Sequence, residues 1–190
     1  MRATGPGQSA RLLLDVVELL ESERIGYAVI GAVAAAVHGV VRASLDADAL
    51  VSVTIQQLIA FQEKLRGLGL QSELRRGDLD DPIPALLVVQ DGFGNQVDLL
   101  AGVRGMEPAA YARCIEVAFE NESLRIVGRE DFIAMKAFAG GPQDLADAKH
   151  AILVNKAHLD LQLLRRLAGT FGKDALAACE RLLVECQAEP

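Results

Sequence analysis

The sequence predicts a mixed α/β domain followed by an all-helical segment. Short apolar runs of strand length alternate with helical patterns in the first two thirds of the chain, whereas only helical spacing is found from Glu130 onward. Hydrophobic residues make up 51% of the 190 residues and aromatic residues only 4%, so the chain can bury a sizeable, aliphatic core. We place the α/β domain at residues 10–128 and a helical segment packed on it at residues 129–190.

The α/β part begins with an expected helix over residues 9–24, in which leucines and valines form one broad stripe and Ser9 occupies the cap position. A short buried strand over residues 27–31 follows and ends at a glycine. The next helix, residues 32–39, consists of small residues and closes at Gly39. The remaining strand candidates are residues 46–53, 70–76, 84–90, 95–102, 114–121 and 122–128.

Helical spacing marks the other elements. Residues 54–69 are expected to form a helix that Thr54 caps and that stops near two glycines. A Gly-Gly-Pro break interrupts the helical pattern of the C-terminal segment once. The helices expected in that segment are residues 130–140, 143–156, 159–169 and 172–187.

The charge of the chain argues against a general nucleic-acid-binding protein. The formal net charge is −7, so there is no global basic field that would attract a phosphate backbone. RNA is therefore disfavoured as a partner, unless a local basic patch forms. The side chains that could form such a patch are Arg75, Arg76, Arg165 and Arg166.

The cysteines and the apolar runs point to a cytosolic protein. Cys114, Cys179 and Cys186 lack the spacing of a metal site, and the last two lie seven residues apart on a predicted helix, where they are expected to face a core. No uninterrupted apolar run approaches the roughly 18 residues of a membrane span. The first ten residues lack the apolar centre of a signal peptide. We expect a soluble cytoplasmic protein that does not contact a membrane.

Two aspartates interrupt an apolar strand candidate in the stretch "RASLDADALV". Asp46 and Asp48 are two residues apart, so in a strand they project from the same face. Adjacent carboxylates repel each other, and removing them from water costs further free energy. Asp98 occupies a similar apolar run, "NQVDLL". Three carboxylates on neighbouring strands would make a site for two divalent cations, as phosphoryl and nucleotidyl transfer require. The alternative for Asp46 and Asp48 is a solvated pair at a strand end.

Two neighbouring features could support such chemistry. In "VIGAVAAAVHG" a strand runs into Gly31 and a helix begins, so unpaired backbone N–H groups could hold a phosphate. An ordinary strand–helix turn is the alternative. Arg42, four residues before Asp46, could contact a phosphate or hold a carboxylate, or it could be a surface arginine.

Together these segments resemble the nucleotidyltransferase superfamily of the DNA polymerase β type. The order of elements over residues 10–155 is similar to the branch that contains the AbiEii-like toxins and related small bacterial nucleotidyltransferase-like proteins. The matching pattern is a strand, a glycine-led turn into a helix that ends in His-Gly, the stretch "RASLDAD" and an aspartate on a later strand. The stretch "DFIAMKAFAGGPQDLADAKHAI" resembles that branch's lysine-bearing helix followed by a D-x-x-D helix. It points to Lys136, Asp144 and Asp147.

The resemblance implies a nucleotidyltransferase-like mixed β-sheet flanked by helices, with a C-terminal helical segment. It implies transfer of a nucleoside monophosphate from a nucleoside triphosphate to an acceptor hydroxyl, with release of pyrophosphate. Mg²⁺ or Mn²⁺ would be the cofactor. The implied catalytic and metal-binding residues are Asp46, Asp48 and Asp98, and the implied nucleotide-binding residues are Gly31, Ala32, Arg42, Ser44 and Lys136.

Two departures from the family pattern concern the phosphate site. The family often has Gly-Ser or Gly-Gly where this chain has Gly31 and Ala32, and alanine supplies no hydroxyl and resists positive φ. The family's threonine is Ser44 here, which is a mild change. The first departure leaves open whether nucleotide binding is intact.

The resemblance leaves the acceptor and the biological role open. The acceptor could be a protein side chain, an RNA 3′ end or a small molecule. The chain could be a component of a toxin–antitoxin pair with an antitoxin or another protein as its partner, and it could form a homodimer. An alternative function is a catalytically idle binding protein that retains the fold. A further alternative is an interaction protein whose C-terminal helices mediate dimerisation.

Several other polar residues have ordinary structural explanations. Asp78, Asp80 and Asp81 in "RRGDLDDPIP" form an acidic turn, although a loop beside the metal site is also conceivable. His38 at a helix end is expected to be structural, where a cation would suit the dipole.

Lys136 on an apolar helix could reach solvent or the active site. Asp144, Asp147 and Lys149 are expected to form a solvated helix face, with Asp144 as a candidate to pair with a buried arginine or lysine.

Overall fold

The computed structural model describes residues 1–78 and 80–188, and the chain contacts divide into two compact units. The first comprises Met1–Val33, Ala43–Arg104 and Glu116–Ile126. The second comprises Ala34–Arg42, Gly105–Ile115 and the chain from Val127 onward.

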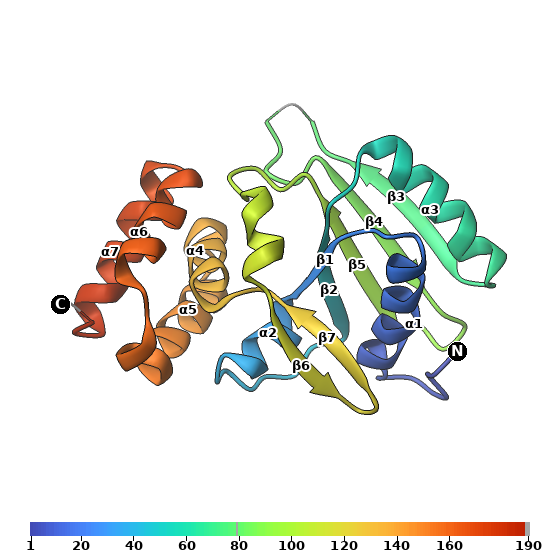
Figure 1. Ribbon diagram of the computed structural model, residues 1–190, viewed down its shortest axis with the longest axis horizontal. Coiled ribbons are helices and arrows are strands. Elements are labelled where there is room, and N and C mark those ends of the chain that lie inside the picture. The colour runs from blue at the N-terminus through green and yellow to red at the C-terminus, as the bar shows by residue number, and fades with distance from the viewer. Residues whose placement is uncertain (79, 189–190) are drawn as a thin grey trace. The chain divides into compact units, whose positions relative to one another are not determined.

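A seven-stranded mixed sheet forms the centre of the first unit, which confirms the predicted α/β fold class (Figure 1). The strand order is β3-β4-β5-β2-β1-β7-β6. Strand β2 is antiparallel to β1 and parallel to β5, and β4 is antiparallel to both β3 and β5. The strands are β1 (Tyr27–Ile30), β2 (Asp46–Val51), β3 (Gln71–Arg76), β4 (Ala85–Gln90), β5 (Gln96–Ala101), β6 (Ile115–Phe119) and β7 (Glu122–Ile126).

Alternation along β2 gives the sheet one apolar face and one face that carries carboxylates. Ala47 and Ala49 are almost fully buried, whereas Asp46 and Asp48 are half-buried and point to the opposite face. Helix α1 (Ser9–Ser22) packs against β2 and β5, and helix α3 (Ile55–Gly67) packs against β3 and β4. The strand that carries Asp46 and Asp48 is therefore held in place by its neighbouring strands and by the packed helices.

Of the two helix caps predicted, Thr54 is confirmed and Ser9 is wrong. Thr54 caps α3 as predicted, in a capping box in which its hydroxyl accepts from the backbone N of Gln57. The assignment of Ser9 as the cap of α1 is wrong. Ser9 is the first residue of α1, and its hydroxyl donates instead to the carbonyl oxygen of Leu45.

The second unit is helical. Helix α4 packs against three other helices, α5, α6 and α7. None of the helices in residues 1–78 and 80–188 has both the length and the apolar character needed to cross a membrane. The helical elements of this unit, apart from the short helix α2 (Gly31–Val37) at the unit boundary, are η1 (Pro108–Arg113), α4 (Arg129–Ala139), α5 (Pro142–Asn155), η2 (Lys156–His158), α6 (Leu161–Thr170) and α7 (Lys173–Glu185).

Candidate active site

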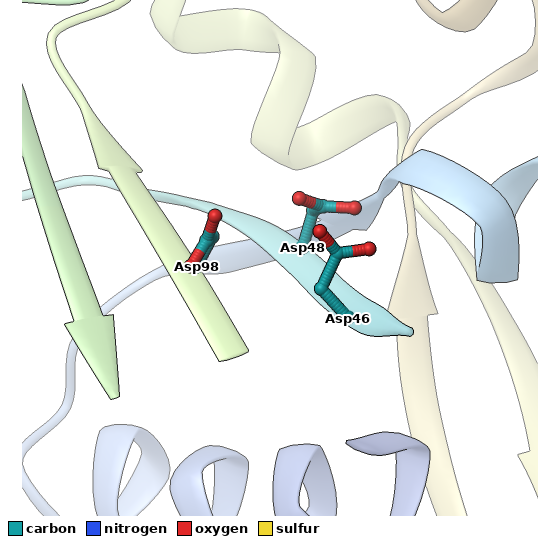
Figure 2. A group of neighbouring side chains, drawn as sticks. All are labelled: Asp46, Asp48 and Asp98. Carbon is teal, nitrogen blue, oxygen red and sulfur yellow. The ribbon is translucent and has the colours of Figure 1, made fainter. Parts of the chain in front are cut away.

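Three carboxylates converge on one face of the sheet. Asp48 on β2 lies directly opposite Asp98 on the parallel strand β5, so both side chains leave the same face. Asp46 precedes Asp48 by two residues and shares that face. One oxygen atom of each carboxylate lies within 4.8 Å of the corresponding oxygens of the other two. Figure 2 shows the three side chains, two from β2 and one from the neighbouring strand.

Neutral polar side chains hold two of these carboxylates. The hydroxyl of Ser44 donates to Oδ1 of Asp46 at 2.6 Å. Nε2 of Gln96 donates to Oδ1 of Asp98 at 2.9 Å, and Nε2 of Gln90 donates in turn to Oε1 of Gln96 at 2.8 Å. Gln96 and Gln90 were not among the residues predicted from the sequence. Strand alternation could have identified Gln96, because it precedes Asp98 by two residues.

Two effects disfavour the charged form of Asp98 within the triad. Burial raises the pKa of Asp98, and the charge of Asp46 raises it further, whereas the hydrogen bond from Gln96 and the charge of Arg75 act in the opposite direction. The donor set consists of carboxylate oxygens alone, which are the ligands that hard divalent cations prefer. The residues present therefore fit a metal ion, and Asp46, Asp48 and Asp98 can hold one.

We expect Gln96→Leu to weaken metal binding. Loss of the amide would free the carboxylate of Asp98, and removal of such a supporting hydrogen bond typically costs about 10- to 100-fold in metal affinity. Titration with Mn²⁺, followed by electron paramagnetic resonance, would measure the change. Gln56→Leu on the exposed surface of α3 is the matched control and should bind Mn²⁺ as the wild type does. Equal affinities in the two variants would contradict the role assigned to Gln96.

The glycine that starts α2 approaches Asp48 closely. Gly31 has a φ of 62°, in the left-handed region. A Cβ atom built on it would lie 1.9 Å from Oδ2 of Asp48, so the side chain of Asp48 would have to shift. Among the described residues, Ala32 is not one of those with positive φ, so its methyl group is not strained there. The departure from the family pattern at Ala32 thus removes a hydroxyl without straining the backbone.

Arg42 and Lys136 both bind a buried aspartate within the second unit. Nε of Arg42 lies 3.2 Å from Oδ2 of Asp147, and Nζ of Lys136 lies 3.1 Å from the same oxygen. The side chain of Asp147 is fully buried, with 0% exposed. The expectation that it belongs to a solvated helix face is therefore wrong, because two cations and the amide of Gln143 compensate its charge. Asp144 pairs with Lys136 at 2.7 Å, as the sequence suggested.

The loop and the histidine have structural roles. Oδ1 of Asp81 accepts a hydrogen bond from the backbone N of Ile83 at 2.8 Å, which is the geometry of a turn. The ring of His38 is buried and its Nε2 lies 2.9 Å from the carbonyl oxygen of Val127. Burial lowers the pKa of His38, so the neutral ring, and not the expected cation, occupies this helix end.

Three of the four arginines considered for a basic patch are bound by glutamates. Arg75 pairs with Glu73, Arg165 with Glu180, and Arg166 with Glu107. These pairs reduce the positive charge available to a phosphate backbone. Among the cysteines, Cys179 and Cys186 are free and buried, as predicted.

No protein-family model matches the chain, and no curated protein matches it either. Solved structures do match its fold. An antigenic nucleotidyltransferase-like protein from Paracoccidioides brasiliensis is 12% identical with a TM-score of 0.53, over 96% of this chain and 91% of that one. The solution structure of the antibiotic-resistance factor ANT(2'')-Ia is 13% identical with a TM-score of 0.59, over 90% and 94%.

A crystal structure of ANT(2'')-Ia in complex with adenylyl-2''-tobramycin is 13% identical with a TM-score of 0.56, over 84% of this chain and 94% of that one. At such low identity these similarities show the fold alone. The AbiEii-like branch stays a prediction of the sequence. The chain has the fold of the nucleotidyltransferase-like proteins.

Proposed function

We propose that this chain is a nucleotidyltransferase that moves a nucleoside monophosphate from a nucleoside triphosphate to an acceptor hydroxyl. The observation that carries the proposal is the convergence of Asp46, Asp48 and Asp98 within 4.8 Å on one face of the sheet. A structural role does not account for three adjacent carboxylates, because mutual repulsion and partial burial both disfavour them. The fold supports the proposal, since ANT(2'')-Ia, which has a similar fold, was solved in complex with adenylyl-2''-tobramycin.

The three aspartates would have different roles in the transfer. Asp46 and Asp48 would hold Mg²⁺ or Mn²⁺, and Asp98 would complete the ligand set. A bound divalent cation would neutralise charge on the triphosphate and lower the pKa of the acceptor hydroxyl. Asp98 would accept the proton of the hydroxyl as its oxygen attacks the α-phosphorus. The bond from that phosphorus to the bridging oxygen would break, and pyrophosphate would leave.

The assignment of Gly31, Ala32, Arg42, Ser44 and Lys136 to the nucleotide rests on the sequence and on the resemblance. Ser44 has an additional role that the contacts support, because its hydrogen bond to Asp46 orients a metal-binding carboxylate. Arg42 and Lys136 are held by Asp147 in the second unit, and a triphosphate would have to compete with that carboxylate. A toxin–antitoxin role, an antitoxin partner and a homodimer remain predictions that follow from the resemblance.

Thermal unfolding with ATP, CTP, GTP and UTP, each with and without Mg²⁺ or Mn²⁺, tests the proposal. We expect at least one nucleotide to stabilise the wild type in a metal-dependent manner. A ligand present at 100 times its Kd adds about 2.7 kcal/mol to the free energy of unfolding. The shift should disappear in the double variant Asp46→Asn with Asp48→Asn.

Two controls make the result specific. The double variant Asp78→Asn with Asp80→Asn removes the same charge from exposed positions in a loop and should keep the full shift. If no nucleotide shifts the wild type, and the Asp46 and Asp48 double variant is more stable than the wild type, the triad is idle and a binding protein that retains the fold is the better description.

A further inference from the structure

A polar depression lies on the two strands beside the triad. Its volume is about 240 Å³, and it belongs entirely to strands β3 and β4 of the first unit. The residues that line it are Gln71, Ser72, Glu73, Arg75, Val88 and Gln90.

Strand register places this depression directly beside Asp98. Val88 on β4 is paired with Asp98 on β5, and Glu73 on β3 is paired with Val88. Paired residues share a face, and neighbouring strands lie about 4.8 Å apart. Glu73, Val88, Asp98 and Asp48 therefore form one row on the face that carries the triad.

A hydrogen-bonded chain also joins the depression to the triad. Gln90 lines the depression, donates to Gln96 at 2.8 Å, and Gln96 donates to Asp98 at 2.9 Å. A molecule bound in the depression would lie next to the carboxylate that is proposed to take a proton from the acceptor.

The lining is polar and carries no net charge. The carboxamides of Gln71 and Gln90 can each donate and accept hydrogen bonds. Glu73 and Arg75 form an ion pair at 2.8 Å, so their charges cancel. Val88 supplies a small apolar surface. Hydroxyl groups also donate and accept, so a molecule with several hydroxyls on a compact ring complements this surface.

Other acceptors fit the depression less well. Its volume lies just below the roughly 300–1,000 Å³ of typical pockets for drug-sized ligands, which suits a single ring. The described residues that line it include no aromatic side chain, so a nucleic-acid base would have no surface on which to stack. The only cation in the described lining, Arg75, is bound to Glu73 and offers little to a phosphate backbone.

We propose that this depression is the acceptor subsite and that it takes a sugar-like ring of a small polyhydroxylated molecule. The inference rests on the proposed nucleotidyl transfer. One ring hydroxyl would face Asp98 and give it a proton. The hydroxyl oxygen would form a bond to the α-phosphorus, and the bond from that phosphorus to the leaving pyrophosphate would break.

Nuclear magnetic resonance of the full chain labelled with ¹⁵N tests the subsite without nucleotide or metal. The probes are maltose, glucosamine and a short single-stranded RNA. We expect at least one of the two sugars to shift the side-chain amide signals of Gln71 and Gln90 in a saturable manner. Gln71→Leu and Gln90→Leu should each weaken that binding by at least about 10-fold, as loss of a hydrogen-bonding group commonly does. Gln56→Leu, at an exposed position on α3, should bind like the wild type.

The other outcomes overturn the subsite. The subsite is rejected if neither sugar gives a saturable shift, or if Gln71→Leu and Gln90→Leu leave sugar binding unchanged. It is also rejected if only the RNA shifts the amide signals of Gln71 and Gln90. The experiment contains no nucleotide, so it is independent of the nucleotide-dependent thermal shift. A thermal shift without sugar binding would reject the subsite and leave nucleotidyl transfer standing. Sugar binding without a thermal shift would leave a sugar site and reject the transfer.

Discussion

Gly31→Ala is expected to lower the affinity for Mn²⁺ by about 100-fold, the upper part of the range for changes that disturb a metal ligand. The added Cβ would lie 1.9 Å from Oδ2, 2.8 Å from Cγ and 3.1 Å from Cβ of Asp48. All three atoms belong to one side chain, so Asp48 must leave its present position relative to Asp46 and Asp98. Titration with Mn²⁺ measures the loss, and the thermal shift with nucleotide should fall with it.

Backbone strain accompanies the clash and has to be separated from it. The φ of Gly31 is 62°, and a non-glycine residue in this region costs roughly 1–2 kcal/mol of stability. Gly69 has a φ of 81° and open space around its Cβ position. Gly69→Ala should therefore lose stability by a similar amount and keep its affinity for Mn²⁺. If Gly31→Ala also kept the wild-type affinity, Gly31 would be no more than a backbone hinge.

Local pattern was sufficient to predict the strands and the shared face of Asp46 and Asp48. Alternation within β2 fixed that Asp46 and Asp48 share a face, and Asp98 interrupts an apolar run in the same way. The register of β2 against β5, which places Asp48 opposite Asp98, depends on pairing between strands 50 residues apart in sequence. No local pattern encodes such pairing. The proximity of Asp98 to the other two aspartates was therefore inferred from the free-energy cost of burying an isolated carboxylate and from the family resemblance.

Gln90 and Gln96, which act through a neighbouring residue, were not predicted because their contacts also depend on strand pairing. A glutamine has no distinctive pattern, and the contact of Gln90 with Gln96 exists only because β4 and β5 are paired. The burial of Asp147 was not predicted, because the sequence of its helix has an amphipathic pattern with a polar residue at that position. Its charge is compensated by Lys136 and Gln143 and by Arg42, which lies 105 residues earlier in the chain.

Asp147→Asn is expected to lower the free energy of unfolding by roughly 3–5 kcal/mol, the usual cost of leaving buried charges without their partner. The substitution keeps the volume of the side chain but removes the negative charge that Arg42 and Lys136 share. Urea denaturation at pH 7 measures the loss. Asp144→Asn is the matched control, because Asp144 is 30% exposed and contacts Lys136 alone among these cations. It should cost less than about 1 kcal/mol.

The effect of Asp147 should also depend on pH. Burial alone raises the pKa of this carboxyl, but hydrogen bonds from Gln143 and Lys136 and the charges of Lys136 and Arg42 outweigh burial, and the net pKa is lowered. A pKa that is lower in the folded state stabilises the protein above the unfolded value, and the contribution is lost as the pH falls through the folded value. The stability difference between wild type and Asp147→Asn should therefore be complete at pH 7 and shrink below about pH 4. A difference that stays constant from pH 7 to pH 3 would mean that packing, and not the charge of Asp147, stabilises the second unit.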